Sequence, residues 1–267
     1  MSLDSLESAA KRQPIEKIVH AATYTVHDDA LERAESRRVV ETNIMGTLNA
    51  LELARRLKVK RFLYVSTAGV YEGVRTEGKF LKEELPLDPR ALYRATKYAG
   101  ELLTRSYGEL HGFETVSVRF GNVYGPMERV TPYRSLMSVP YHWTGSVVRG
   151  EPIRALPDRY GFDLTYVLDV AEAIRLLLDA PVLEHPVYNV AAGRVLHLRD
   201  MVEAMRHRWP EVRFAEPLPL EEGQSVSIAK ASYGSRIRDE LGWEPRYDVV
   251  AGLRDYVEWR RGFPVGH

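Results

Sequence analysis

The sequence predicts an α/β protein built on a doubly wound parallel sheet, and three observations carry that prediction. Two nearly continuous apolar runs, Arg61–Ser66 and Thr115–Phe120, are typical of strands buried on both faces. Helical patterns, in which apolar residues recur three or four positions apart, alternate with these runs. Such alternation is typical of a parallel sheet that is covered by helices on both sides.

The first half of the chain supplies the clearest elements. Asp4 is a candidate cap for a short helix that ends at Lys11. The spacing of apolar residues such as Val40, Ile44 and Leu48 predicts one long helix from Arg37 to Leu57. In chain order we expect a helix over 4–11, a strand over 18–22, a helix over 37–57, a strand over 61–66, a helix over 94–110 and a strand over 115–120.

The pattern weakens after Gly125-Pro126. We expect helices over 139–149, 169–178, 198–209, 237–241 and 250–260, short strands over 165–167 and 187–190, and a loop over 217–223. Residues 1–125 then form the sheet domain. Residues 126–267 form mainly a smaller α/β cap, from which some segments return to the sheet. Because open α/β sheets bind ligands at the carboxyl ends of their strands, we expect a substrate site beneath this cap.

Composition excludes several classes of function. Among the 267 residues, Lys+Arg and Asp+Glu balance at 37 each, so no net charge favours nucleic acid or an anionic membrane. The absence of cysteine excludes disulfides, thiolate metal sites and a cysteine nucleophile. No histidine pair has the helical spacing of zinc ligands, and His27 with its acidic neighbours indicates a solvated turn rather than a metal site. With no membrane span and no signal peptide in the sequence, we expect a cytoplasmic protein.

The segment Tyr93-Arg94-Ala95-Thr96-Lys97 carries the most chemical information. A Tyr and a Lys four positions apart near the start of a helix share one face. An ammonium near a phenol favours the phenolate and lowers the tyrosine pKa toward neutral pH, where it can act as a general base. Ser66 and Thr67 follow a buried strand and place hydroxyls at its carboxyl end. Taken singly, each feature is compatible with ordinary surface or strand-end residues; together they predict an acid–base site.

Several ordered motifs resemble one family. They are Val19–Ala22, Asn43–Thr47, Ser66–Tyr71, Tyr93–Lys97 and Arg119–Pro126, followed by Tyr166–Ala171, Tyr188–Val190 and Leu241–Trp243. Together they are similar to the extended short-chain dehydrogenase/reductases with a Rossmann-like fold, in the NAD-dependent epimerase/dehydratase branch typified by UDP-glucose 4-epimerase. The resemblance runs from about residue 4 to about residue 260.

The resemblance implies roles for particular residues. Tyr93 would be the catalytic acid/base, Lys97 would lower its pKa and hold the cofactor ribose, and Thr67 would be the third catalytic residue. The implied cofactor is NAD, with NADP as an alternative, and the implied partners are a nucleotide sugar and a second copy of the chain in a homodimer. Residues matching cofactor-contacting positions are Ala21, Ala22, Asn43, Ser66, Tyr93, Lys97 and Val123; Asn122 matches a substrate diphosphate contact.

The chain also departs from the family pattern. No Gly-x-x-Gly-x-x-Gly occurs in it, so residues 1–125 are predicted to be a partial dinucleotide-binding domain that lacks its first β-α-β unit. The strand over 18–22 would then form an edge of the sheet. Phe162 stands where the family has a phosphate-binding Arg, so Arg159, Arg236 or another basic residue would take that part. Ala68 and Gly69 follow Thr67 in place of the acidic pair of 4,6-dehydratases, which disfavours elimination.

Three interpretations of function follow from these observations. The first is an epimerase or reductase that acts on a nucleotide sugar through a transient 4-keto intermediate. The second is a truncated, catalytically silent binding or assembly module, and the third is a reductase of a non-sugar alcohol or ketone. The missing segment itself has three interpretations. The chain is shortened or its gene start is placed too late; the chain dimerises through the exposed edge of its sheet; or it is a remnant that folds but no longer holds a cofactor.

Overall fold

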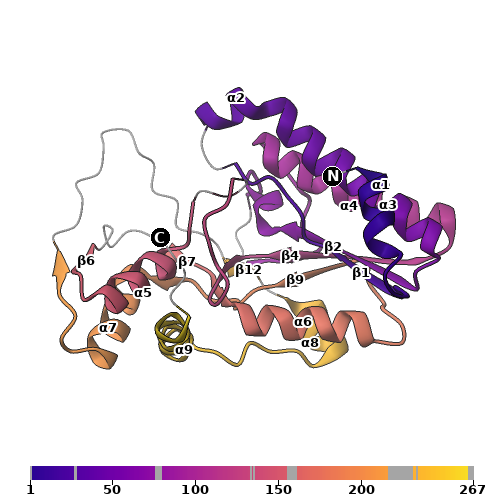
Figure 1. Ribbon diagram of the computed structural model, residues 1–267. Coiled ribbons are helices and arrows are strands. Elements are labelled where there is room, and N and C mark those ends of the chain that lie inside the picture. Colours follow the sequence, from indigo (N-terminus) through magenta and orange to yellow (C-terminus); the bar gives the residue numbers. More distant parts are fainter. Residues whose placement is uncertain are drawn as a thin grey trace.

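A computed structural model describes residues 2–26, 29–75, 80–132, 134, 136–154, 161–215, 231–232 and 234–263. Its main sheet has four parallel strands in the order β1-β2-β4-β9 (Figure 1). The strands are β1 (Lys17–His20), β2 (Arg61–Thr67), β4 (Glu114–Phe120) and β9 (Val187–Val190). The predicted parallel α/β sheet is confirmed.

Helices cover both faces of this sheet, as the doubly wound prediction requires. Figure 1 shows α3 (Gly46–Leu57) and α4 (Leu92–His111) on one face, and α6 (Val167–Asp179) and α8 (Ser235–Leu241) on the other. Phe62 and Tyr64 of β2 pack with residues of α3, whereas the intervening Leu63 packs with residues of α6. Successive strand residues point to opposite faces, so a strand between two helical layers needs apolar residues throughout.

The long helix predicted over residues 37–57 is in fact three elements. These are α2 (Asp29–Val40), a π-helical turn at Glu41–Met45, and α3. The helix begins earlier than expected because Asp29 and Glu32 place acidic side chains in its first turn, which the helix dipole favours. The π-helical turn carries the buried Asn43, and such turns frequently occur at functional sites.

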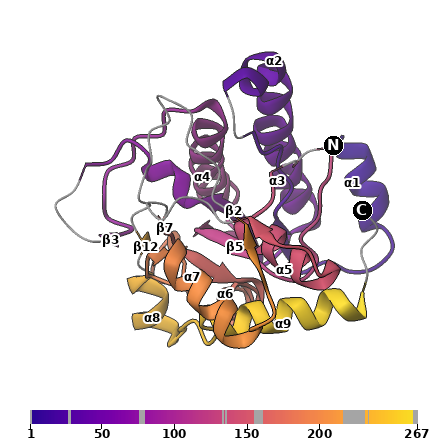
Figure 2. The same ribbon diagram turned by 90° about the vertical axis from the view of Figure 1, so that its left-hand side faces the viewer.

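Three further helices lie beyond the carboxyl ends of the main-sheet strands, and we call them the second layer. They are α5 (Val139–Arg149), α7 (Leu198–Arg208) and α9 (Val249–Gly262), seen from that end in Figure 2. Trp143, Met201 and Tyr256 belong to a core that these helices share and that is separate from the core under the sheet. A short helix α1 (Leu3–Ala10) contacts α3. The loop expected over 217–223 lies outside the described residues.

Among the described residues, eight short strands outside the main sheet pair two by two. They are β5 (Asn122–Tyr124) with β8 (Leu164–Tyr166), β3 (Phe80–Leu81) with β12 (Ala231–Ser232), β6 (Ile153–Arg154) with β11 (Phe214–Ala215), and β7 (Gly161–Phe162) with β10 (Leu196–His197). The sequence predicted only β8 among them.

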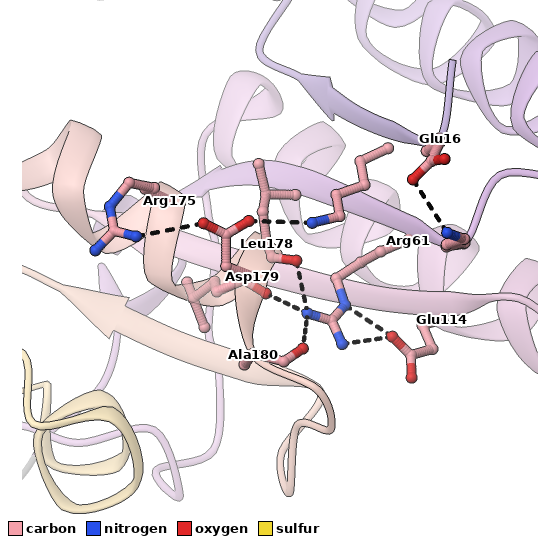
Figure 3. A network of polar contacts seen from close by, with 10 residues as sticks. Glu16, Arg61, Glu114, Arg175, Leu178, Asp179 and Ala180 are labelled. Atoms are coloured by element: carbon pink, nitrogen blue, oxygen red, sulfur yellow. Dashed lines mark hydrogen bonds and ion pairs between the residues drawn. The ribbon is translucent and has the colours of Figure 1, made fainter. Parts of the chain in front are cut away.

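At the amino ends of the main-sheet strands, the side chain of Arg61 joins two strands to a helix. Its side chain is 4% exposed, and Nη1 donates to the carbonyls of Leu177 and Ala180 at 2.6 and 2.7 Å, at the end of α6 (Figure 3). Its Nε also donates to Glu114 at 2.8 Å. The carbonyls at a helix end have no partner within the helix, and a buried guanidinium satisfies them here.

The strand β1 lies at one end of the strand order, as expected, and pairs there only with β2 among the described strands. Val19 on this edge is 40% exposed. Within the part of the chain that is described, no helix has the length and apolar character needed to cross a membrane.

Candidate functional site

A cavity of about 880 Å³ lies at the carboxyl ends of β2 and β4. Thr67 ends β2, Phe120 ends β4, and Tyr93 lies in the first turn of α4; all three line the cavity. Asn122 at the start of β5 lines it as well. The structure therefore brings together three of the predicted site residues, Thr67, Tyr93 and Asn122, at the edge of the sheet where ligands of open α/β proteins bind.

The local fold holds Tyr93 at the start of α4. Its backbone N–H donates to Oε1 of Glu32 in α2 at 2.9 Å, and its carbonyl accepts from Thr96 Oγ1 at 2.7 Å. Burial raises the pKa of the Tyr93 phenol, and hydrogen bonding with the side chains of Thr25 and Thr23 only partly opposes this. The predicted lowering of this pKa is therefore wrong. Desolvation of the phenolate is the larger effect.

Thr67 forms the turn that follows β2. Its Oγ1 accepts a hydrogen bond from the N–H of Gly69 at 3.1 Å and caps the short 3₁₀ helix at Ala68–Tyr71. An oxygen that accepts from the backbone still has its own proton to donate. The turn therefore fixes the position of the hydroxyl and leaves it able to donate toward the cavity.

Lys97 lies one turn after Tyr93 and is 2% exposed. Its Nζ lies 4.5 Å from the centre of the Tyr64 ring, the distance of a cation–π contact. Burial lowers the pKa of Lys97 to about 8, although the nearby Glu101 opposes the shift. Lys97 is thus buried behind the cavity, and it is not among the residues that line it.

Two more predicted cofactor contacts, Ser66 and Asn43, are occupied by contacts within the protein. Ser66 is 4% exposed, and its Oγ donates to Glu101 Oε1 at 2.5 Å. The Asn43 carboxamide accepts from Tyr24 N at 2.7 Å and donates to Thr96 Oγ1 at 3.0 Å. Asn43 therefore ties the segment after β1 to α4 and helps to position the residues beside Tyr93.

The other predicted residues differ in their surroundings. Ala21 and Ala22 are exposed just beyond the carboxyl end of β1, and Val123 packs partly against the core under the sheet. Arg236 donates to the carbonyl of Val187 at 3.1 Å and does not line the cavity. Arg159 lies outside the described residues.

Charged residues that the sequence reasoning missed also line the cavity. Arg94 forms an ion pair with Glu72, and burial lowers the pKa of Arg94. Glu72 also accepts from the N–H groups of Arg90 and Ala91 just before α4. In the sequence, the position of Arg94 next to Tyr93 was the signal that could have identified Arg94 as a site residue. Glu72 could be recognised in sequence only as a departure from the family pattern.

These features are typical of α/β enzymes that bind their ligands at the carboxyl ends of parallel strands. The fold is a doubly wound α/β sheet, and a hydroxyl and a phenol face one cavity at its strand ends. The profile of the NAD dependent epimerase/dehydratase family matches residues 1–191, so the chain belongs to this family of enzymes.

Known proteins agree with this assignment. A dTDP-glucose 4,6-dehydratase of Streptomyces niveus is 32% identical over 252 residues, which are 91% of this chain and 69% of the relative. A probable UDP-glucuronate 4-epimerase of Rhizobium meliloti is 27% identical over 275 residues, which are 96% of this chain and 77% of the relative.

Solved structures show the same fold. UDP-glucose 4-epimerase of Thermotoga maritima, crystallised with UDP-glucose, is 25% identical with a TM-score of 0.83, and the match covers 99% of this chain and 84% of that one. UDP-glucose 4-epimerase of Thermus thermophilus, in complex with NAD, is 27% identical with a TM-score of 0.77, and the match covers 98% and 84%.

Proposed function

We propose that the cavity is the acid–base centre of an NAD-dependent enzyme that acts on a nucleotide sugar, with epimerisation at C4 through a 4-keto intermediate. The observation that carries this proposal is that Thr67 and Tyr93, 26 residues apart in sequence, line one cavity at the strand ends. Relatives that are themselves described as UDP-sugar epimerases support the substrate class.

The residues of the cavity fit the reacting half of NAD. A phenol and an alcohol face the same space, and a buried ammonium lies one helical turn behind the phenol. The pyrophosphate of dinucleotides is received in this class by a glycine-rich turn before a helix, and no Gly-x-x-Gly-x-x-Gly occurs in the 267 residues. We therefore assign only the nicotinamide and ribose end to these residues. When bound, NAD supplies the hydride acceptor of the reaction.

Tyr93 has two opposite tasks in this proposal. As a base, its phenolate takes the proton of the substrate 4-hydroxyl while the C4–H bond breaks and its electron pair leaves as hydride. As an acid, the phenol returns that proton to the 4-keto oxygen when hydride is delivered to C4. The raised pKa suits the acid task, since it keeps Tyr93 protonated at neutral pH before substrate binds. Lys97, on the same helix face, is the cation that favours the phenolate.

Other residues of the cavity would hold the substrate. The Thr67 hydroxyl can donate a hydrogen bond to the 4-oxygen, where negative charge develops as the proton leaves. Asn122 is exposed at the cavity wall and can contact the diphosphate. Arg94 offers a guanidinium, but it is neutralised in part by Glu72, so a diphosphate would have to compete with that carboxylate.

A panel of substrates tests the proposal. The chain would be incubated with NAD and, separately, UDP-glucose, UDP-glucuronate, dTDP-glucose and a hydroxysteroid, and the products would be followed by proton NMR. We expect a 4-epimer from at least one nucleotide sugar. Turnover of the steroid alone would instead support the reductase of a non-sugar alcohol, for which Phe162 in place of the family's Arg is the favouring feature.

A second candidate is a binding or assembly module without turnover. It is favoured by the same lack of a glycine-rich turn within the 267 residues. Calorimetry with NAD and NADP discriminates between the two candidates. Binding in the micromolar range supports the enzyme, whereas no binding and no turnover of any compound in the panel support the module.

A further inference from the structure

Glu101 of α4 lies at the centre of a buried polar cluster. Its side chain is 4% exposed, and its two oxygens accept from Arg119 Nε and Nη2 at 3.0 and 2.7 Å. Oε1 also accepts from Ser66 Oγ at 2.5 Å. A carboxylate bound in two places by a guanidinium and again by a hydroxyl has a fixed position, because charge-assisted bonds of this kind are strong and directional.

Tyr93, Lys97 and Glu101 are spaced four residues apart and therefore follow one face of α4. Groups from neighbouring elements complete the surroundings of the Lys97 ammonium. Tyr64 of β2 presents its ring at 4.5 Å, and His20 of β1, whose pKa is lowered to about 4 by burial and by Lys97, is neutral near pH 7.

The balance of buried charges makes Glu101 the important member of this cluster. Lys97 and Arg119 are two cations that are 2% and 4% exposed, while Glu101 is the carboxylate that acts on both of them. An isolated charge in a protein interior is costly, and a lysine commonly responds by losing its proton. Without Glu101, the pair of cations would have no buried counter-ion within this cluster.

We propose that Glu101 is a positioning residue for the acid–base site: its carboxylate keeps the buried Lys97 ammonium charged and ties the helix of Tyr93 to the strand that ends in Thr67. This inference rests on the proposed function. The tie to the strand is direct, because Ser66, which donates to Glu101, is the residue before Thr67.

The cluster also reaches the wall of the cavity. Arg119 Nη1 donates to the Tyr71 hydroxyl at 2.7 Å, and that hydroxyl donates to Asn189 Oδ1 at 3.0 Å. Tyr71 lines the cavity, and Asn189 donates in turn to the carbonyl of Leu81, which also lines it. Through Arg119 and Tyr71, Glu101 therefore connects the helix of the proposed acid–base residue with the wall of the cavity.

The test is an NMR titration of the Lys97 side chain in protein labelled with ¹³C at the lysine ε-carbon. The Lys97 signal is assigned by its loss in Lys97→Met. In the parent chain we expect a midpoint near pH 8. In Glu101→Gln the protonation constant should fall roughly tenfold or more, which is one pH unit or more in the midpoint. Glu101→Asp keeps the negative charge, so its Lys97 midpoint should lie close to that of the parent chain.

A matched control separates the loss of the Glu101 charge from the general effect of replacing a glutamate in α4. Glu109→Gln makes the same change at an exposed position of α4 and should leave the Lys97 midpoint where it is. If Glu101→Gln does not fold, Arg119→Gln replaces it. Removing the competing cation should raise the Lys97 midpoint.

Two results would overturn the proposal. One is a folded Glu101→Gln whose Lys97 midpoint equals that of the parent chain, and the other is an Arg119→Gln whose midpoint fails to rise. Because the titration needs neither NAD nor substrate, it is independent of the assay for turnover. A failure of the proposed function and a failure of this inference can therefore be told apart.

Discussion

The backbone N–H of Tyr93 donates to the side chain of Glu32 across the interface between α4 and α2, at 2.9 Å. Glu32 therefore caps α4, the helix that carries the proposed acid–base residue Tyr93. The cap comes from another helix rather than from the residue that precedes α4. This arrangement explains how α4 begins without a side-chain cap of its own at Ala91. A carboxylate at this place also interacts favourably with the helix dipole.

Replacing Glu32 should loosen the start of α4. Glu32→Ala removes an acceptor from an N-terminal N–H, and we expect a loss of about 1–2 kcal/mol in the free energy of unfolding. Urea titration measures this loss of unfolding free energy. Glu35→Ala, which breaks only a surface ion pair with Arg38 on the same helix, should cost less than about 1 kcal/mol. Equal losses in the two variants would contradict the capping role.

Arg61 should contribute far more to the free energy of unfolding than a nearby surface cation does. Arg61→Met leaves the carbonyls at the end of α6 without their donor, and we expect it to cost about 2–3 kcal/mol of unfolding free energy. Lys60→Met breaks the exposed ion pair with Glu16, also drawn in Figure 3, and should cost less than about 1 kcal/mol. Denaturant curves of both variants test the difference. A loss below about 1 kcal/mol for Arg61→Met would refute the account of the helix end.

The buried His20 should make the protein less stable in mild acid. Burial holds its pKa at about 4, while in the unfolded chain the value is near 6.5. Between these values the unfolded state binds a proton that the folded state does not. The contribution of His20 is therefore present above pH 6.5 and is lost as the pH falls toward 4, by up to about 3 kcal/mol.

This pH dependence can be assigned by substitution. His20→Gln cannot titrate, so its stability should change less between about pH 7.5 and about pH 4.5 than that of the parent chain, as measured by thermal unfolding. His207→Gln, at an exposed position of α7, should keep the pH dependence of the parent. If His20→Gln and the parent chain respond alike to pH, the assignment is wrong.

Gly100 lets α4 approach β2 closely. A Cβ at this position would meet the hydroxyl of Tyr64, which is buried and has no hydrogen-bond partner of normal geometry among the described residues. We expect Gly100→Ala to cost about 1–3 kcal/mol despite the better helix propensity of alanine.

A second substitution provides the control. Tyr64→Phe removes the hydroxyl and should itself change stability by less than about 1 kcal/mol. In the Gly100→Ala/Tyr64→Phe double variant, most of the loss should be recovered. Strict additivity of the two single changes would show that the close approach has no energetic consequence.

The sequence predicted the buried strands well because their signal is local. The apolar runs at β2 and β4 and the capped helix α5 have nearly the expected bounds. The π-helical turn at Glu41–Met45 left no such signal, since its residues continue the helical pattern on either side. Two-residue strands such as β3 also escaped prediction, because a partner at residues 231–232 defines them.

The site was predictable in part for similar reasons. Thr67 and Tyr93 line one cavity because each lies at an element end that a parallel sheet places at the same edge. The carboxylates of Glu32 and Glu101 could not be predicted, since their roles depend on contacts between helices or with strands far along the chain. The pKa of Tyr93 was predicted in the wrong direction because sequence spacing shows the nearby cation but not the burial of the phenol.

Turnover by Tyr93→Phe is the most direct test of the acid–base assignment. Tyr98→Phe, on the same helix and outside the cavity, is its control. With a nucleotide sugar that the parent chain converts, we predict a loss of at least about a hundredfold in kcat for Tyr93→Phe and less than about twofold for Tyr98→Phe. A Tyr93→Phe variant that retains the kcat of the parent would contradict the account.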